Sequence, residues 1–481
     1  MLGLSVNNAL GQEKANYYEI PLVEDQMIEK TIALDNSIIV SQLESYFKAD
    51  YVPTRRYLQF KHDLTLLQDT VIDIPFRNKR VSHYSNDSQF YEFFYDYLKG
   101  NYSLVEVGDS GIQVEAGRFP NKLYEPQLVR THTTKFILDK RVKKERVYVI
   151  QDDQEKGVST SVSRMKKRTK VSALFFDVVS NSSDVSYIWR ESSNRVDDVH
   201  ALIWTNDGEL LHRFSLQLPD KSIHSVSISQ IDEDRYLVTG TYATYQTKMA
   251  SGAFMAIIED GAMMEVTLYS FSELPHYFDY LDRYEKEEMK RKMARLKKHE
   301  KSTEIRTQAI CHPVKQMGES YLLAIEFYEE SYTNDYGVTR NGNTIAGTPQ
   351  TLKGYEYSHG TVLRFDLNGQ LKHDYYLPIE LEYLAKTKDL KLKSVVVGDT
   401  LYIGYAALNH LYFGNIKPAA FVSLTKESAV ANEPDSVIRK EAKFTYLDDG
   451  RVLVYGFKTT KSGKGLNKKA DIYFIETRKV R

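Results

Sequence analysis

The stretch LIWTNDGELLHRFSLQLP, Leu202–Pro219, places an Asp-Gly pair between two runs in which apolar and polar residues alternate. Alternation with a period of two predicts β-strands, and Asp-Gly between them predicts a type I′ hairpin turn, which needs positive φ at both central residues. Two other stretches align with it without a gap, LQFKHDLTLLQDTVIDIP (Leu58–Pro75) and LRFDLNGQLKHDYYLPI (Leu363–Ile379). In the earlier copy Leu64 replaces the glycine, so we expect a looser turn or another turn type there. The chain therefore repeats a two-stranded unit.

Weaker copies extend this repeat along the chain. MAIIEDGAMMEVTLYSF, Met255–Phe271, keeps the Asp-Gly pair, and three further runs alternate without a turn signal, Phe136–Val149, Phe421–Val430 and Ile472–Val480. The turns of the strong copies are separated by 207 − 63 = 144 and 368 − 207 = 161 residues, about two units each time. We therefore expect seven hairpins or terminal strands, near residues 57, 136, 201, 254, 362, 421 and 472.

These units, each a small antiparallel sheet, resemble the blades of β-propellers, and FDLNG (Phe365–Gly369) is similar to the FDxxG segment of propeller repeats. The resemblance implies an all-β fold, a single propeller of seven blades over residues 12–481. Insertions are expected, because seven units in this length exceed the ~40–45 residues of compact propeller repeats. Two stacked β-sandwiches or a fibronectin-like array are the alternative architectures.

The two ends of the chain predict how the ring is completed. ADIYFIET, Ala470–Thr477, lacks a following strand, and ANYYEIPLV, Ala15–Val23, lacks a preceding one. Pairing these two segments would complete the last blade and protect two strand edges.

Composition excludes several classes of protein. The 481 residues carry 64 Lys+Arg and 65 Asp+Glu, a formal net charge of −1, which argues against a chain-wide electrostatic contact with nucleic acid. The hydrophobic share of 42% argues against a disordered chain. A single cysteine, Cys311, excludes intramolecular disulfides. No run approaches 18 consecutive apolar residues, so we expect no transmembrane segment.

The N-terminal segment MLGLSVNNALG, Met1–Gly11, suggests export. Ala9 and Gly11 match the small-residue pattern that precedes a signal-peptidase cut, although the charged and most of the apolar parts of a full signal are missing. We interpret residues 1–11 as the remnant of a secretory signal peptide and expect a periplasmic, outer-membrane or cell-surface location. If Met1 is the true start, a cytoplasmic location is the alternative.

One segment departs from the β pattern. LDRYEKEEMKRKMARLKKHE, Leu281–Glu300, contains no Gly or Pro, is rich in helix formers, and places acidic residues before basic ones. It predicts a charged helix within an insertion at residues 274–303. The simplest interpretation is a solvated helix on the rim. The functional alternative is a partner-binding helix, with candidate contacts Lys290, Arg291, Arg295 and Lys298.

Residues 331–360 form a polar stretch between two predicted strands, and we expect a long loop there. Loops of this length without their own structure are usually functional or disordered. Tyrosine supplies rigid, amphipathic contact area at interfaces. The candidate partner-binding residues of this loop are Tyr332, Tyr336, Tyr355 and Tyr357.

Catalytic motifs find little support. GDSG, Gly108–Gly111, matches part of the nucleophile motif of trypsin-like proteases, but Ile112 replaces the next glycine, and the four residues separate two strand-like runs. They therefore predict a hairpin turn. The 12 histidines contain no H-E-x-x-H pattern, so we assign no metal site, no cofactor and no catalytic residue. A carboxylate pair of the glycosidase kind cannot be selected among 65 acidic residues.

The sequence therefore favours a non-catalytic interaction or scaffold protein, an exported subunit or accessory protein of a bacterial cell-envelope, outer-membrane assembly. We expect a protein partner, with a membrane-embedded complex among the candidates, and no nucleic acid. The alternative is a propeller enzyme or binding protein that acts on carbohydrate or a small ligand at the central axis. That alternative predicts a pocket there with at least two close carboxylates or histidines.

Overall fold

The structure is a computed structural model that describes the chain from residue 16 to residue 479 with internal gaps. The gaps are residues 23–25, 44–53, 76–78, 87, 120–121, 132–133, 142–143, 152–153, 156–159, 162–169, 193–196, 245–248, 300–301, 333–338, 341–342, 345–350, 380–384, 386–389, 408–409, 418–419, 429–436, 448 and 461–469. The interpretation of residues 1–11 as a signal remnant therefore falls outside the described residues and stays a prediction.

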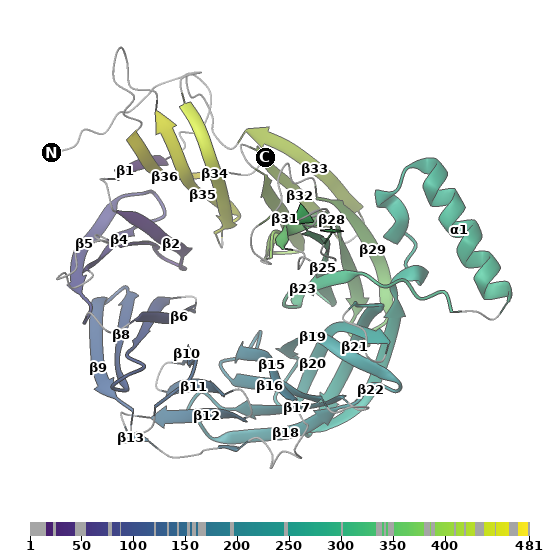
Figure 1. Cartoon of the computed structure of the whole chain (residues 1–481), viewed down its shortest axis with the longest axis horizontal. Helices are drawn as coiled ribbons and strands as arrows, with labels where there is room; N and C mark the ends of the chain where they lie inside the picture. Colours follow the sequence, from purple (N-terminus) through teal and green to yellow (C-terminus); the bar gives the residue numbers. More distant parts are fainter. Residues whose placement is uncertain are drawn as a thin grey trace.

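The described residues form an all-β, propeller-like ring of eight sheets with four or five strands each (Figure 1). The first four are β2–β5 (Met27–Ala33, Ile38–Leu43, Thr54–Phe60, Leu66–Asp73), β6–β9 (Lys79–Ser85, Gln89–Tyr95, Asn101–Gly108, Gly111–Arg118), β10–β14 (Gln127–Arg130, Thr134–Arg141, Lys144–Gln151, Gln154–Glu155, Thr160–Ser161) and β15–β18 (Lys170–Val178, Val185–Ser192, Asp197–Trp204, Leu210–Leu216). The next three are β19–β22 (Lys221–Gln230, Arg235–Thr244, Gly252–Glu259, Ala262–Ser270), the sheet of β23, β24, β25, β28 and β29 (Gln308–Cys311, Lys315–Met317, Ser320–Tyr332, Leu352–Asp366, Leu371–Pro378), and β30–β33 (Lys393–Val397, Thr400–Ala407, His410–Lys417, Ala420–Ser428). The eighth joins β1 (Asn16–Pro21) to β34–β36 (Val437–Tyr446, Arg451–Thr460, Ala470–Lys479), while β26 (Thr339–Arg340) and β27 (Asn343–Thr344) pair only with each other.

The predicted pairing of the two chain ends is confirmed. β1 runs antiparallel to β36, with Asn16 opposite Thr477 and Ile20 opposite Tyr473. The eighth sheet is therefore built from both ends of the sequence. This pairing covers one edge of β36 that would otherwise expose a row of unpaired backbone groups.

The expected number of seven sheets is one too few for the described residues. The sheet that the repeat search missed is β6–β9, which contains the GDSG turn between β8 and β9. Gly108 lies directly opposite Gly111 at the end of this hairpin, so the turn prediction for GDSG is confirmed. The sheet escaped the count because its turn was recognised as a hairpin but not as another copy of the repeat.

The core lies between neighbouring sheets, because both faces of each middle strand are covered. In β3 all six residues are buried: Ile38 and Val40 pack in one core cluster with Tyr473, while Ile39 packs in another cluster with Phe90. Strands buried on both faces read as continuous apolar runs, whereas half-exposed strands alternate. β5, on the far side of the same sheet, shows that alternation of exposed and partly exposed residues.

The hairpin turns differ from the prediction in type. Only Asp260 and Gly261 both have positive φ, as a type I′ turn requires; in the strongest copy Gly208 alone does, at φ 84°, beside a register shift in the ladder. Leu64 adopts φ 63° and keeps the same backbone bonding as Gly208, so its turn is neither looser nor of another type. The Leu64 side chain is buried in the adjoining core, which offsets the cost of the left-handed conformation.

The inserted helix α1 spans Arg283–Lys298 and lies outside the ring (Figure 1). Two short 3-10 turns precede it, η1 (Phe271–Glu273) and η2 (Tyr277–Tyr280). Asp282 caps its N-terminus in a capping box with Glu285, and Lys286 pairs with Asp279. Within the part of the chain that the structure describes, no helix has the length and apolarity needed to cross a membrane.

The range 331–360 is only partly a loop. β25 continues to Tyr332 and β28 begins at Leu352, with Tyr328 opposite Tyr357 and Ser331 opposite Gly354. The two strands thus extend the hairpin into the range where the sequence predicted no regular structure. Alternating apolar residues in GYEYSHG continue the strand pattern, which the polar composition of the flanking residues had hidden.

Candidate functional site

A cavity of about 390 Å³ lies among the first strands of three sheets that are neighbours in the ring, β2, β30 and β34. These first strands lie on the inner side of the ring, as β2 and β6 do in Figure 1. The lining residues are Ile28, Glu29, Lys30, Thr31, Ile32, Leu390, Lys391, Lys393, Ala406, Ala442, Lys443, Phe444, Tyr455, Gly456, Phe457 and Tyr473. A concave site with mixed apolar and polar lining is the usual form of a small-ligand pocket.

The charged groups of this lining are strongly unequal. Among the lining residues that the structure describes, four are lysines and one, Glu29, carries a carboxylate. Lys30 and Lys391 are half-buried, whereas Lys393 and Lys443 are exposed. The four lysines come from three different sheets rather than from one strand.

A β-bulge positions Glu29. β2 pairs with β3 through Ile28 opposite Gln42 and Lys30 opposite Ser41, which leaves Glu29 as an extra, unpaired residue in the ladder. Such bulges re-aim side chains and occur beside functional sites. The first strands β6, β15, β19 and β34 show the same kind of register shift. The irregularity is thus a recurring property of the inner strands rather than an accident of β2.

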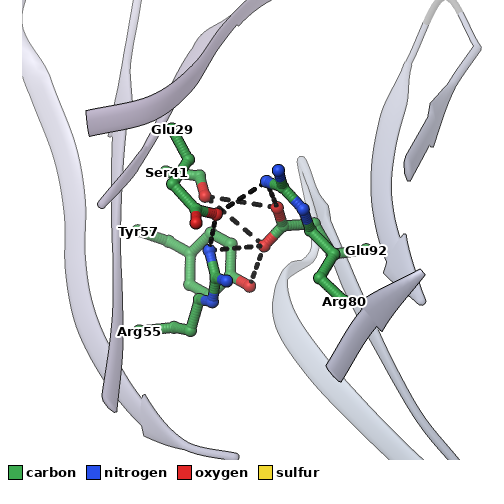
Figure 2. Close-up of polar contacts among 6 residues, drawn as sticks. All are labelled: Glu29, Ser41, Arg55, Tyr57, Arg80 and Glu92. Carbon is green, nitrogen blue, oxygen red and sulfur yellow. Dashed lines mark hydrogen bonds and ion pairs between the residues drawn. The ribbon is translucent and has the colours of Figure 1, made fainter. Parts of the chain in front are cut away.

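Glu29 also belongs to a largely buried charge network between the β2–β5 and β6–β9 sheets (Figure 2). Arg80 Nη1 lies 2.6 Å from Glu29 Oε2 and 3.1 Å from Glu92 Oε1, so it bridges both carboxylates. Arg55 also pairs with Glu29 and lies 3.9 Å from Glu92. Two guanidinium groups thus face two carboxylates, and the charge of Glu29 is balanced within the network.

Hydroxyl groups complete the shell around Glu92, whose side chain is fully buried. The Tyr57 hydroxyl donates to Glu92 Oε2 at 2.6 Å, and the Ser41 hydroxyl lies 3.4 Å from both carboxylate oxygens. Burial, followed by the negative charge of Glu92, raises the pKa of Tyr57 well above its usual range, so this hydroxyl stays a donor. Burial lowers the pKa of Arg55, but Glu92 and Glu29 outweigh that effect and raise it.

The charges of Lys30 and Arg80 also affect the protonation of a nearby histidine, His83. Partial burial, and then the charges of Lys30 and Arg80, lower the pKa of His83 in β6 to about 4, although part of its ring is exposed. At neutral pH this histidine is therefore uncharged.

Glu326, in β25, holds the segment that leads from Lys391 into β30. Its fully buried carboxylate accepts hydrogen bonds from the backbone N–H groups of Lys391 (3.0 Å) and Leu392 (2.9 Å). His312 Nε2 lies 2.6 Å from the same carboxylate. Bonds to a fixed, buried acceptor restrict the backbone of residues 391–392 and thus the position of the Lys391 side chain.

The predicted partner-binding tyrosines are not brought together as one exposed surface. Tyr357 is a buried core residue, with the ammonium group of Lys391 5.5 Å from its ring centroid, so its assignment to an exposed loop is wrong. Tyr355 is half-buried against the same core, and Tyr332 is exposed, with its hydroxyl bonded to Glu330. Tyr336 lies outside the described residues. Tyr357 was misassigned because strand and core extend further than the polar sequence suggested.

The predicted basic residues are all exposed on α1, at Lys290, Arg291, Arg295 and Lys298. Their helix is joined to the hairpin of β25 and β28 through η2, where the Tyr280 ring stacks on His359 at 4.2 Å between centroids. The helix lies on the outside of the ring, away from the cavity on the inner strands (Figure 1). Whether these four residues bind a partner stays a prediction.

Sequence reasoning missed the cavity lysines because no local motif contains them. Lys30 and Lys443 are more than 400 residues apart, and the ring brings them to the same cavity. The usable signal was their position: each lies on, or just before, the first strand of a sheet. Among the described residues, no group of three or more His, Cys, Asp or Glu is placed to hold a metal ion.

Solved structures resemble this chain only distantly. No family model matches the chain, and no curated protein does. A prolyl endopeptidase structure aligns at 12% identity and TM-score 0.42, covering 92% of this chain and 54% of its own. The polysaccharide lyase Uly1 aligns at 10% identity and TM-score 0.40 (82% and 89% covered), and the AfRom2 CNH domain at 9% and 0.33 (83% and 94%). This chain therefore spans about half the length of the prolyl endopeptidase.

Proposed function

We propose that this chain is a single propeller of eight blades that works as a binding protein and holds a small ligand in the cavity between β2, β30 and β34. The observation that carries the proposal is the cavity itself, formed on the inner strands by polar and aromatic side chains from three sheets. A site assembled from several sheets keeps its shape only when the ring is complete, which suits recognition by a preorganised pocket.

The carboxylates at this site favour binding over acid–base catalysis. A glycosidase needs two carboxyl groups that face the substrate from a shared cleft. Here Glu29 is the one carboxylate among the described lining residues, and it pairs with Arg55 and Arg80. Glu92, the next carboxylate, is fully buried and bonded to Tyr57, so it belongs to the support of the site.

Filling the cavity tests this proposal. Ala406 lines it and is only half-buried, so Ala406→Trp would occupy ligand space with a modest effect on the fold. Thermal-shift screening with neutral and charged sugars and metabolites, followed by calorimetry, should identify ligands that stabilise the native protein but not Ala406→Trp. Met264→Trp, at an exposed position on β22, is the matched control and should bind as the native protein does.

Two results would overturn the proposal. Ligands that bind Ala406→Trp as tightly as the native protein must occupy another site. Ligands that are converted to new products, followed by NMR during incubation, would establish the enzymatic alternative.

A second candidate function is docking of a protein partner, with export and a place in a cell-envelope assembly as first expected. What supports it is α1, which has no buried residue and presents Lys290, Arg291, Arg295 and Lys298 to solvent. The test is co-purification from the native host before and after deletion of residues 282–299. Loss of one defined partner would support this function, whereas unchanged partners would exclude α1 as the docking element.

A further inference from the structure

We infer that the outward side of α1 binds an acidic segment of a partner protein, an extended stretch rich in Asp and Glu. This inference rests on the second candidate function and names the chemistry of the partner. The observation that carries it is a basic set in the second half of the helix, where residues 290–298 include no acidic residue. The basic set consists of Lys290, Arg291, Lys292, Arg295, Lys297 and Lys298.

The charges of the basic set are unpaired. All six residues are exposed, and none of their side chains forms an ion pair or a hydrogen bond with another residue that the structure describes. Lys286, in the first half of the helix, by contrast pairs with Asp279. The nearest carboxylates of the helix, Glu287 and Glu288, would offset at most two of the six charges. The second half of α1 therefore carries an excess of positive charge.

The stability of the helix does not account for this excess. Basic residues in the last turn, such as Lys297 and Lys298, complement the helix dipole. Residues 290–292 lie before the last turn, where that effect has fallen off. Like charges three or four residues apart, such as Arg291 and Arg295, destabilise a helix. A helix that only faced solvent would be more stable with mixed charges here, so the basic set indicates a negatively charged ligand.

The contact with the ring determines which side of α1 faces outward. Met289 and Met293 pack against the core cluster that includes Phe278. At about 3.6 residues per turn, Arg291 and Lys298 lie on the side opposite these two methionines. The other members of the basic set lie on either side of that pair. Positive charge thus covers the outward side and both flanks of the helix.

The distribution of charge over the whole chain favours a narrow partner. α1 carries eight Lys and Arg and three Glu, a net charge of 8 − 3 = +5, so the rest of the chain carries −1 − 5 = −6. A membrane or a nucleic-acid duplex presents a broad negative surface, which this acidic remainder would repel. Because Met289 and Met293 face the ring, they are not presented for insertion into lipid.

A single extended segment suits the helix better. It can follow α1 along its length and reach both flanks without approaching the ring. The guanidinium groups of Arg291 and Arg295 can each bind a carboxylate through two parallel N–H groups. We therefore expect the partner to supply several carboxylates from consecutive or alternate residues.

Fluorescence anisotropy with a labelled poly-glutamate peptide tests the inference on the full chain, with poly-glutamine as the neutral counterpart. We expect the acidic peptide to bind at least about tenfold more tightly than the neutral one, with an affinity that falls as NaCl rises. Vesicles of phosphatidylglycerol and phosphatidylcholine, and a short DNA duplex, serve as the alternative anionic probes.

A double variant locates the binding. Arg291→Gln with Arg295→Gln should weaken the acidic peptide by about fivefold or more, since each exposed ion pair contributes modestly. Glutamine has about the helix propensity of arginine, so the helix is retained. The matched control is Arg118→Gln with Arg213→Gln, at exposed positions on β9 and β18, and it should leave the affinity unchanged. Thermal unfolding of both variants checks that the fold is intact.

Several outcomes would overturn the inference. The acidic recognition is wrong if the peptide does not bind at about 1 mM, or if the α1 double variant binds it normally. Vesicles or DNA that bind α1 more tightly than the peptide would replace the acidic segment with a lipid or nucleic-acid partner. If deletion of residues 282–299 still removes a defined partner in any of these cases, docking through α1 stands and only its chemistry fails. Unchanged partners after that deletion would overturn the docking function itself.

Discussion

Tyr57, in the first complete sheet, donates its hydroxyl hydrogen to the buried carboxylate of Glu92 in the next sheet, at 2.6 Å. The bond crosses the boundary between two sheets, beside an apolar cluster that includes Ile39 and Phe90. It belongs to a network that also holds Arg55, Arg80 and Glu29, so the stability of this boundary depends on polar groups that satisfy one another.

Tyr57→Phe should therefore destabilise the fold by about 1–3 kcal/mol, because it removes a donor from a buried carboxylate without changing the shape of the core. Chemical denaturation measures the change. Tyr284→Phe, at an exposed position on α1, removes the same hydroxyl and should have no measurable effect. Equal stability of both variants would show that Glu92 does not need this donor.

Glu326→Gln should loosen the segment that leads into β30. The amide keeps one acceptor oxygen but turns its NH₂ group toward one of the two backbone N–H groups, that of Lys391 or that of Leu392, at a cost of about 1–3 kcal/mol. Hydrogen exchange should show faster exchange at these two amides than at the rest of β30–β33. The control is Glu329→Gln, at an exposed position in β25, the strand that also contains Glu326. It should leave the protection of the two amides unchanged.

His359 predicts a pH dependence of stability. It is buried between the rings of Phe327 and Tyr280, and burial lowers its pKa to about 3. The unfolded chain binds a proton near pH 6.5, whereas the folded chain does not until about pH 3, so stability is lost as the pH falls between these values. At pH 5 the loss from this one group is about 2 kcal/mol.

His359→Phe keeps an aromatic ring in the stack and removes the titrating group. Urea unfolding at pH 7.5, 6 and 5 should show a smaller loss of stability in this variant by about 2 kcal/mol at pH 5. An unchanged pH profile would mean that other groups account for the acid sensitivity.

Leu64→Gly tests how much a buried side chain contributes at a turn position that favours glycine. Leu64 has φ 63° and is buried in the core, so the change relieves about 1 kcal/mol of backbone strain but loses about 2–3 kcal/mol of apolar burial. We expect net destabilisation by about 1–2 kcal/mol in denaturant titrations. A gain in stability would show that strain outweighs burial at this turn.

Much of the fold follows from period-two alternation and turn residues. Asp207-Gly208 and Asn368-Gly369 predicted hairpins that the structure contains, and the segments near residues 16 and 470 predicted the pairing of β1 with β36. The β6–β9 sheet was missed because an aromatic-rich strand such as QFYEFFY lacks the alternation of the repeat. Six of its seven residues, all except Gln89, are buried, because both faces of the strand are covered.

The candidate site could not be predicted in the same way. Lys30, Lys391 and Lys443 are distant in sequence, and only the order of the sheets around the ring makes them neighbours. Glu92 and Glu326 could not be singled out among the 65 acidic residues, although each is fully buried. Local sequence shows that a residue is charged. The groups that pair with that charge when it is buried come from other sheets, so local sequence does not show them.

The pairing of β1 with β36 also constrains the order in which the molecule can be made. Residues 16–21 are synthesised long before their partner strand, residues 470–479. The eighth sheet therefore forms only after synthesis has reached these residues, through a contact that spans more than 450 positions of sequence. Long-range contacts of this kind slow folding. Until that step, the chain has to keep β1 from pairing with other exposed strand edges, its own or those of neighbouring chains.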